Sequence, residues 1–261
     1  MTTLVTFHAH PDDEAIATAG VMARAVGEGR RVVLVLATRG EVGEVADGFL
    51  APGESLAERR VAETHAAAEI IGVHRVAFLG YADSGLLPPG EAPPPGSFAA
   101  ADVEEAAARL AALLREEQAD VLTVYDDNGG YGHPDHIQVH RVGVRAAELA
   151  GTPRVCESTV DRDYMRQVVA ESQARGEADL PDPVDIETLG VPGHRITTVV
   201  DVRPWLEVKR AAMRAHASQI TEDSFFLALS PEAFALTFGQ EAFIRRDAPP
   251  GTRETDLFAG L

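Results

Sequence analysis

Short apolar runs alternate with longer amphipathic segments along the first 150 residues. Each run is mostly Val, Leu and Phe, and the segment after it has apolar residues every three or four positions, a pattern typical of a strand followed by a helix. Strands joined by helices of this length need right-handed crossovers and therefore form a parallel sheet. The strands are expected at residues 4–7, 31–37, 75–79 and 121–125, and the helices at 15–28, 56–71, 102–117 and 134–149.

The regular alternation of strand and helix ends after the fourth helix. We therefore predict one α/β domain over residues 1–261, in which 1–160 form a mostly parallel sheet flanked by helices. Residues 161–261 are expected to add a lid and a C-terminal α+β extension. The elements of this extension are expected as a strand at 196–202, a helix at 205–217 and a last strand at 241–246.

Two proline-rich segments interrupt the pattern. Residues 88–96, with the sequence P-P-G-E-A-P-P-P-G, predict a surface loop, because proline fits neither a helix interior nor a central strand. Residues 173–193 are polar and predict an insertion or lid. Both segments are expected to shape the substrate pocket. The tail from Asp247 carries Pro-Pro-Gly and is expected to be mobile.

The charge balance narrows the classes of partner. The chain has 23 Lys and Arg against 41 Asp and Glu, a formal net charge of -18. Such a surface repels nucleic acid, anionic membranes and highly anionic polymers, so none of these is expected as a partner. The N-terminus shows no signal peptide and no apolar run approaches the ~18 residues of a membrane span, so a cytoplasmic protein is expected. The oligomeric state stays open, and a homo-oligomer is compatible with the sequence.

Cys156 is the only cysteine in the chain. A disulfide framework or a cysteine-rich zinc site is therefore impossible within it. We expect Cys156 to be an inert buried thiol.

Histidines, carboxylates and glycines follow each of the four predicted parallel strands. Ligands of open parallel sheets bind beyond the carboxyl ends of the strands, so these segments should converge on one site. They are His8–Glu14, Thr38–Glu41, Tyr81–Gly85 and Asp126–His136.

Three of these side chains form a candidate metal site. His10 and Asp13 are three residues apart and can face one point in a first helical turn. His136 could supply the third ligand, and a catalytic zinc site takes three protein ligands of this kind. Asp12 is then free to act as a general base toward a metal-activated water. Zinc is the expected ion, although Fe²⁺ would satisfy the same ligands.

Tyr131 and His133 lie just before His136, and either could donate a hydrogen bond to the oxyanion of a tetrahedral intermediate. The alternative is that each His-Pro-Asp segment merely begins a helix. That explanation covers one motif, but not two that each follow a buried strand directly.

The other histidines are not expected to bind the metal. His8 alternates with His10 along a strand end and should point away from it. His140 lies one turn beyond His136, and either supports a ligand or belongs to the core. Three further histidines, His65, His74 and His194, are expected on the surface.

Two other motifs fit poorly. The pattern from His8 to Asp13 partly resembles the H-x-H-x-D-H motif of the metallo-β-lactamase fold, but Asp13 replaces the final histidine and the strand pattern of that fold is absent. No G-x-G-x-x-G follows the first strand, so a dinucleotide-binding domain is unsupported.

The segments A-H-P-D-D-E at 9–14 and G-G-Y-G-H-P-D-H at 129–136 resemble the LmbE-like, or PIG-L, de-N-acetylase family. This resemblance implies a Rossmann-like fold and zinc dependence. The long second motif is most similar to the mycothiol-pathway members, which deacetylate a glucosaminyl-inositol or cleave mycothiol conjugates.

The resemblance also implies a role for each matching residue. Zinc would be held by His10, Asp13 and His136, with Asp12 as the general base. Tyr131 and His133 would polarise the amide carbonyl, and Asp135 would orient a histidine. Arg60 and Asp83 match positions that bind sugar hydroxyls. The segment His216–Gln219, H-A-S-Q, is similar to a late family motif near the site, which makes Gln219 a candidate substrate-binding residue.

These observations predict a zinc-dependent hydrolase that removes an N-acetyl or similar acyl group from an amino-sugar conjugate. An amidase of mycothiol-type or antibiotic-type amides needs the same chemistry at the carbonyl, and the motifs do not separate the two. A metal- or sugar-binding protein without turnover is the non-enzymatic alternative. Asp12 argues against it, because a simple metal site does not need that carboxylate.

Overall fold

A seven-stranded mixed sheet forms the centre of the computed structural model, which describes residues 1–88, 90–174 and 186–261. The strand order is β3-β2-β1-β4-β5-β7-β6. The first five strands are parallel, β7 is antiparallel to β5, and β6 is antiparallel to β7. The strands are β1 Thr3–His8, β2 Arg31–Leu36, β3 Arg75–Phe78, β4 Val121–Tyr125, β5 Arg154–Thr159, β6 Thr198–Asp201 and β7 Gln240–Arg245. The predicted α/β fold is confirmed.

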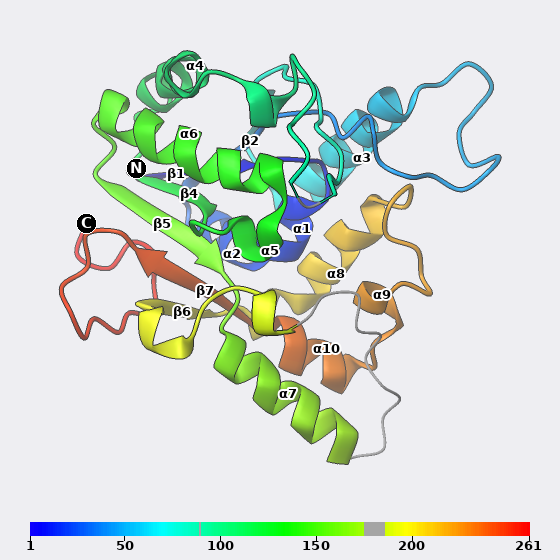
Figure 1. Ribbon diagram of the computed structural model, residues 1–261. Helices are drawn as coiled ribbons and strands as arrows, with labels where there is room; N and C mark the ends of the chain where they lie inside the picture. Colours follow the sequence, from blue (N-terminus) through cyan, green and yellow to red (C-terminus); the bar gives the residue numbers. More distant parts are fainter. Residues whose placement is uncertain (89, 175–185) are drawn as a thin grey trace.

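Helices cover both faces of this sheet (Figure 1). Alternate residues of a strand point to opposite faces, so Val5 and Phe7 pack toward α4 and α6, whereas Leu4 packs toward α2 and α8. The helices are α1 Asp13–Ala17, α2 Ala19–Gly27, α3 Leu56–Ile71, α4 Val103–Glu116, α5 Gly129–Gly132, α6 Pro134–Ala150, α7 Arg162–Ala174, α8 Leu206–Ala215, α9 Phe225–Ala228 and α10 Pro231–Phe238. Among the described residues, no helix is long and apolar enough to cross a bilayer.

The first predicted helix is two helices in the structure. α1 ends at Ala17 and α2 begins at Ala19, because Thr18 leaves the helical region with a φ of -138°. The short α1 therefore belongs to the connection after β1, whereas α2 packs against the sheet.

Strand β5 and helices α7 and α10 were not predicted. Charged residues interrupt the apolar pattern of β5, yet Arg154 and Glu157 are both buried in it. Both side chains are hydrogen-bonded. The Arg154 guanidinium donates to the carbonyl of Leu257 at 2.8 Å, and Arg246 donates to the Glu157 carboxylate at 2.7 Å.

The expected mobile tail instead packs against the core. Leu257 and Phe258 are buried, and the guanidinium of Arg30 stacks 3.8 Å from the centre of the Phe258 ring. Of the predicted lid at 173–193, residues 175–185 lie outside the described part of the chain.

A buried ion pair joins the C-terminal extension to the first layer of helices. The Glu241 carboxylate accepts hydrogen bonds from the backbone N–H groups of Gly20 and Val21, both at 2.8 Å, and from Lys209 Nζ at 2.5 Å. A carboxylate at this position complements the positive end of the α2 dipole. The close approach requires glycine at position 20, where a Cβ would lie 2.5 Å from that of Val202.

Candidate active site

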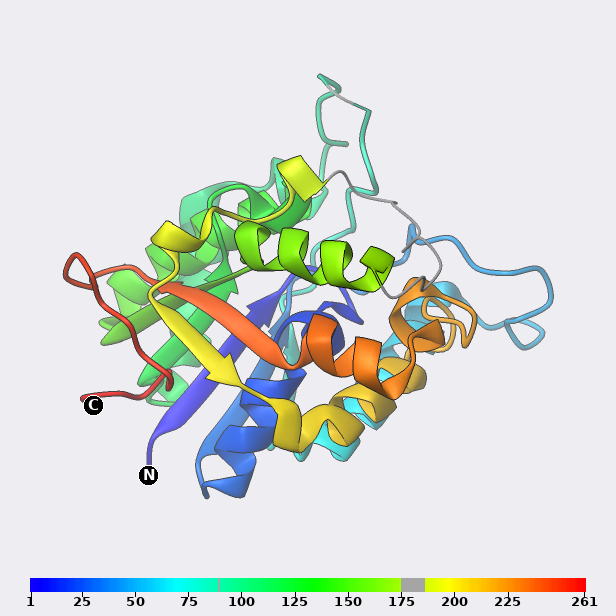
Figure 2. The same cartoon turned by 90° about the horizontal axis from the view of Figure 1, so that it is seen from below.

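The predicted site residues converge at the carboxyl ends of β1, β2 and β4 and the loop after β3. Two long loops, at residues 39–54 and at the described residues 82–88 and 90–97, project from this end of the molecule (Figure 2). They are joined at their bases, because Glu41 accepts from the backbone N–H of Asp83 at 3.0 Å and Asp83 accepts from that of Val42 at 3.4 Å. The two loops are therefore hydrogen-bonded to each other beside the site.

His10, Asp13 and His136 lie together as the sequence predicted. The Asp13 carboxylate lies between the two rings, with Oδ2 3.5 Å from His10 Nδ1 and Oδ1 3.4 Å from His136 Nε2. Burial alone would raise the pKa of Asp13, but His136 and His10 hold it well below its usual range. Asp13 is therefore an anion placed between two imidazoles.

Hydrogen bonds fix which nitrogen of each imidazole is free. His136 Nδ1 lies 3.2 Å from the carbonyl of Gly129, which can only accept, so its proton is on Nδ1. Nε2 then keeps a lone pair, and it is buried with no hydrogen-bond partner among the described residues. A buried imidazole lone pair beside a carboxylate fits a metal ligand.

Asp135 fixes His10 in the same way. The Nε2 atom of His10 lies 3.1 Å from Asp135 Oδ2 and 3.3 Å from Asp83 Oδ1, and both of these carboxylates accept its proton. The Nδ1 atom is left facing Asp13. The expectation that Asp135 orients a histidine thus corresponds to a contact with His10 in the structure.

His133 lies close enough to His10 and His136 to bind a metal ion together with them. One nitrogen from each of His10, His133 and His136 falls within 4.8 Å of the others, and a second such group is His10, Asp83 and Asp135. The cluster can hold a metal ion. His133 Nδ1 accepts from the backbone N–H of Asp135 at 3.2 Å, which leaves its Nε2 protonated and able to donate.

Asp12 has the one strongly unusual backbone conformation in the described part of the site. Its φ is 97°, a value that non-glycine residues adopt rarely. The Arg60 guanidinium lies 3.3 Å from its carboxylate. Burial raises the pKa of Asp12 to about 6, against the opposing charge of Arg60. The carboxylate is therefore poised to exchange a proton near neutral pH.

Arg60 was expected to bind sugar hydroxyls, but its guanidinium is already engaged by the protein. It donates to the carbonyls of Pro11 and Gly40 in addition to its contact with Asp12. The side chain is 4% exposed. This geometry favours support of the Asp12 loop over direct contact with a sugar.

Gln219 also bonds to protein groups. Its amide donates to the carbonyls of Glu44 and Ser218, both at 2.9 Å. It therefore ties the loop after β2 to the C-terminal extension.

Tyr131 lies at the mouth of the cluster and is 42% exposed. Its ring centre is 5.0 Å from that of His136 and 6.1 Å from that of His133. Burial of the hydroxyl and the nearby Asp13 raise the pKa of Tyr131, so the phenol stays protonated and can donate. Tyr131 and His133 thus offer donors on the same side of the site.

His8 and Tyr125 support the site from below, a layer that the sequence did not predict. His8 points away from the metal cluster as expected and bonds to the Tyr125 hydroxyl and to Thr18, both at 2.8 Å. The Tyr125 ring stacks on His136 with centres 4.4 Å apart and an angle of 11°. The pair fixes the plane of the His136 imidazole.

The remaining candidates lie outside the cluster. His140 bonds to the carbonyl of Tyr125 at 2.9 Å, and the three other histidines predicted on the surface are exposed. Cys156 is buried, which raises its pKa to about 12 and keeps the thiol protonated, as predicted.

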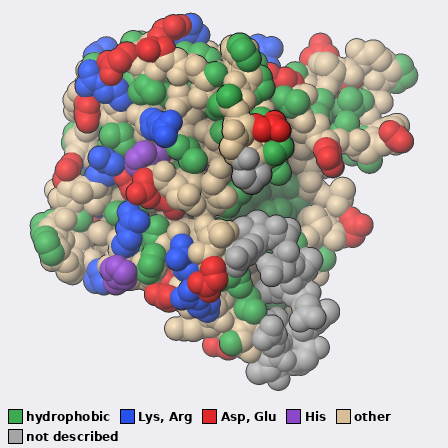
Figure 3. All heavy atoms as spheres, in the orientation of Figure 1, with side chains coloured by type: hydrophobic (Ala, Val, Ile, Leu, Met, Phe, Trp, Pro, Cys, Tyr) green, Lys and Arg blue, Asp and Glu red, His purple; other side chains and the backbone are tan. Residues whose placement is uncertain are grey.

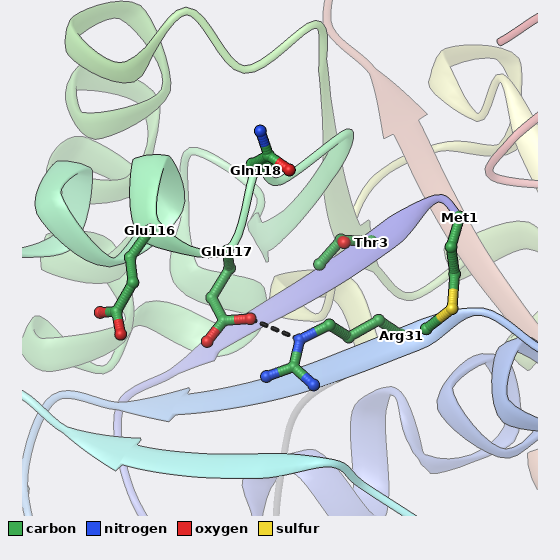
Figure 4. Close-up of a pocket in the computed structure, with 6 residues that line it drawn as sticks. All are labelled: Met1, Thr3, Arg31, Glu116, Glu117 and Gln118. Atoms are coloured by element: carbon green, nitrogen blue, oxygen red, sulfur yellow. Dashed lines mark hydrogen bonds and ion pairs between the residues drawn. The ribbon is translucent and has the colours of Figure 1, made fainter.

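A second cavity, of about 370 Å³, lies at the opposite, amino-terminal end of the strands (Figure 4). Glu117 in its lining bonds to Arg31, also in the lining, at 2.5 Å and to the nearby Arg75 at 2.6 Å. On the face shown in Figure 3 acidic and basic side chains are likewise interspersed. The amino-terminal cavity is a region of balanced charge without the unpaired groups of the cluster.

Relatives of this chain share nearly its whole length. An enzyme of Streptomyces avermitilis, 1D-myo-inositol 2-acetamido-2-deoxy-α-D-glucopyranoside deacetylase, is 42% identical over 99% of this chain and 97% of its own. An enzyme of the same name from Thermobifida fusca is 41% identical, with 98% of each chain covered.

Solved structures share the fold at lower identity. N,N'-diacetylchitobiose deacetylase from Pyrococcus horikoshii aligns with a TM-score of 0.60 at 24% identity, over 96% of this chain and 84% of its own. The 4-carboxy-2-hydroxymuconate hydratase of Pseudomonas putida aligns with a TM-score of 0.65 at 17% identity, over 95% and 98%. The fold thus carries more than one chemistry. The model of the PIG-L family, described as GlcNAc-PI de-N-acetylase, matches residues 5–147. Because this match spans more than half of the chain, and because relatives of about 40% identity cover nearly its full length, the chain belongs to the PIG-L family.

Proposed function

We propose that this protein removes the acetyl group from 1D-myo-inositol 2-acetamido-2-deoxy-α-D-glucopyranoside or a closely related amino-sugar conjugate. It is an amide hydrolase of the N-deacetylase type, as its relatives named for that reaction indicate. The observation that supports this most directly is the cluster of His10, Asp13 and His136, because it combines metal-ligand chemistry with an adjacent strained carboxylate, Asp12.

Zinc is the proposed ion, with His10, Asp13 and His136 as its ligands. Two neutral imidazoles and one carboxylate are a usual ligand set for catalytic zinc, and Fe²⁺ would accept it as well. When bound, the ion supplies Lewis-acid polarisation and lowers the pKa of a coordinated water. The buried Nε2 lone pair of His136 supports its assignment as a ligand.

Asp12 is the proposed general base. It takes a proton from the attacking water as the new C–O bond forms, and it returns this proton to the nitrogen when the C–N bond breaks. The products are acetic acid and the amine, which at neutral pH leave as acetate and the protonated amine, so atoms and charge balance. A pKa of about 6 suits both steps, because the carboxylate is ionised at neutral pH and its conjugate acid still donates readily.

His133 and Tyr131 are the proposed donors to the amide oxygen. The proton of His133 is on Nε2, since Nδ1 accepts from the backbone, and the Tyr131 phenol is protonated. Donors that are fixed before the reaction stabilise the developing oxyanion without reorganisation.

Asp83 is proposed to accept hydrogen bonds from sugar hydroxyls. Gly85 donates its backbone N–H to Asp83 Oδ1 at 2.8 Å, which holds the carboxylate at the rim. A carboxylate has further acceptor sites that can serve a polyol.

Amine release from the zinc-loaded protein tests the proposal. The substrates are the acetylated glucosaminyl-inositol, N-acetylglucosamine and a minimal N-alkylacetamide, each followed with a fluorogenic amine reagent. We expect the rate to be greatest on the inositol conjugate. Absence of amine release from all three, at full zinc content, would contradict the proposed function.

A further inference from the structure

A buried acid–imidazole pair lies directly beneath Asp12. His216 Nε2 is 2.6 Å from Glu14 Oε1, and both side chains are 0% exposed. The two residues are 202 positions apart, so the pair links the C-terminal extension to the loop after β1. Burying a carboxylate is costly unless it is paired and its other oxygen is also bonded.

The other oxygen of Glu14 bonds to Asp12 itself. Glu14 Oε2 accepts from the backbone N–H of Asp12 at 3.1 Å. Asp12 holds a φ of 97° and a ψ of -32°. Such a conformation is strained in a non-glycine residue and persists only where surrounding contacts impose it. Glu14 therefore bonds directly to the backbone of the strained residue, Asp12.

Two groups therefore hold Asp12, one at its side chain and one at its backbone. Arg60 contacts the carboxylate at 3.3 Å and also bonds to the carbonyl of Pro11, while Glu14 holds the N–H group. Arg60 contacts the carboxylate, whereas the contact from Glu14 is to the backbone N–H, although the charge of Glu14 also raises the pKa of Asp12. His216 in turn fixes Glu14, because it is the imidazole partner of the first oxygen.

We propose that Glu14 and His216 are positioning residues that hold Asp12 in its left-handed conformation and thereby aim its carboxylate at the reacting water. The inference rests on the proposed role of Asp12 as the general base. It gives the late H-A-S-Q segment a role in turnover through His216, separate from substrate binding.

A second buried carboxylate, that of Glu63 in α3, bonds to the same segment and provides a matched control. Glu63 is also buried, and its two oxygens accept from the backbone N–H of Ser218 at 3.0 Å and from its hydroxyl at 2.6 Å. This contact anchors the segment to α3 but is directed at Ser218 and not at Asp12. If the Glu14 pair only anchored the extension, removal of either carboxylate would have the same consequence.

The experiment compares the zinc-loaded wild type with Glu14→Ala, Glu14→Gln, His216→Gln and Glu63→Ala. For each protein, kcat, KM, zinc content and thermal midpoint are measured on the substrate that the wild type hydrolyses best. We expect Glu14→Ala to lower kcat ~10–100-fold with KM and zinc content unchanged, a loss typical of removing a supporting contact. Glu14→Gln should restore most of kcat, because an amide oxygen accepts the same N–H of Asp12.

His216→Gln should lower kcat less than Glu14→Ala, since Glu14 keeps its bond to Asp12. Glu63→Ala should lower the thermal midpoint but leave kcat within about twofold. Wild-type kcat in Glu14→Ala would overturn the inference, as would an equal loss of kcat in Glu14→Gln. If Glu14→Ala does not fold, His216→Gln tests the positioning role instead. Its kcat should fall, whereas the kcat of the Glu63→Ala control should stay within about twofold of the wild type, and an unchanged kcat in His216→Gln would then overturn the inference.

Crystal structures separate this inference from the proposed function. If the wild type releases no amine, or if Asp12→Ala is fully active, the assignment of Asp12 as the base falls. The structure of Glu14→Ala still decides the positioning claim: a φ of Asp12 outside the left-handed region supports it. A φ that stays near 97°, with the Arg60 contact intact, overturns it.

Discussion

The two ends of the parallel sheet carry charged clusters of opposite design. At the amino-terminal end, Glu116 and Glu117 face Arg31 and Arg75, and every charge has a partner of opposite sign. At the carboxyl end, four carboxylates share one guanidinium, that of Arg60, and three imidazoles. The carboxylates are Asp12, Asp13, Asp83 and Asp135.

The difference shows what an unbalanced cluster means. Buried carboxylates repel one another and lose hydration, so their excess is destabilising unless a cation joins them. In the protein alone, contacts with Asp13, Asp135 and Asp83 overcome the effect of burial and raise the pKa of His10 well above its usual value. A metal ion would supply the same positive charge. Balance thus indicates a structural cluster, and imbalance indicates a binding site.

Of the variants proposed at the two ends of the sheet, removal of a metal ligand should have the largest effect on zinc binding and activity. His136→Ala is expected to abolish stoichiometric zinc binding and, with it, nearly all amine release, because the Nε2 lone pair is lost. Metal analysis of the purified variant checks this. His140→Ala is the control on the same helix and should keep its zinc, since among the described residues His140 bonds to the backbone carbonyl of Tyr125 and lies near Glu157. Unchanged zinc content in His136→Ala would refute the ligand assignment.

Asp12→Ala should separate the base from the metal ligands within the same cluster. We expect kcat to fall ~10²–10⁴-fold while the zinc content stays that of the wild type. The neighbouring variant Asp13→Ala should lose zinc as well. Near-normal turnover by Asp12→Ala would place the base elsewhere.

The raised pKa of Asp12 predicts a pH dependence. The base acts only when it is deprotonated, and burial raises its pKa to about 6, so kcat/KM should fall below about pH 6 by about tenfold per unit. Zinc content must be measured at each pH, because protonation of the ligands also releases metal. A flat profile from about pH 5 to pH 7 at constant zinc would be inconsistent with Asp12 as the base.

Asp83→Ala tests whether the carboxyl-end cluster also recognises sugar. We expect about a tenfold loss of kcat/KM on the inositol conjugate and little change on a minimal acetamide. Equal losses on both substrates would show instead that Asp83 serves His10, which it contacts at 3.3 Å.

The smallest effect is expected at the amino-terminal end. Glu117→Gln should lower the free energy of unfolding by about 1 kcal/mol, since its two arginine partners are about one-third exposed and screened by solvent. The kcat/KM should not change. Urea denaturation and steady-state kinetics measure the two quantities, and a loss of activity would break the distinction between the two ends.

The sequence predicted most of the carboxyl-end cluster because its members lie in two contiguous motifs placed after predicted strands. It did not assign a role to Glu14 or His216, since no local pattern joins residues 202 positions apart. It likewise missed β5, because the hydrogen-bond partners that allow Arg154 and Glu157 to be buried lie about 90 to 100 positions away. Arg60 was recognised as a site residue, but its contacts with Pro11 and Gly40 depend on loop geometry that the sequence does not show.

The Glu241 cap on α2 has a consequence for synthesis of the chain. The N–H groups of Gly20 and Val21 leave the ribosome early, but their carboxylate partner follows about 220 positions later. A nascent chain that has not yet released β7 therefore holds α2 with an unfinished first turn, beside the loop that carries Asp12 and Asp13. Contacts of such sequence separation make folding slow and concerted over the whole chain. A translation product that stops short of Glu241 should consequently be cleared by proteases before it can hold a metal.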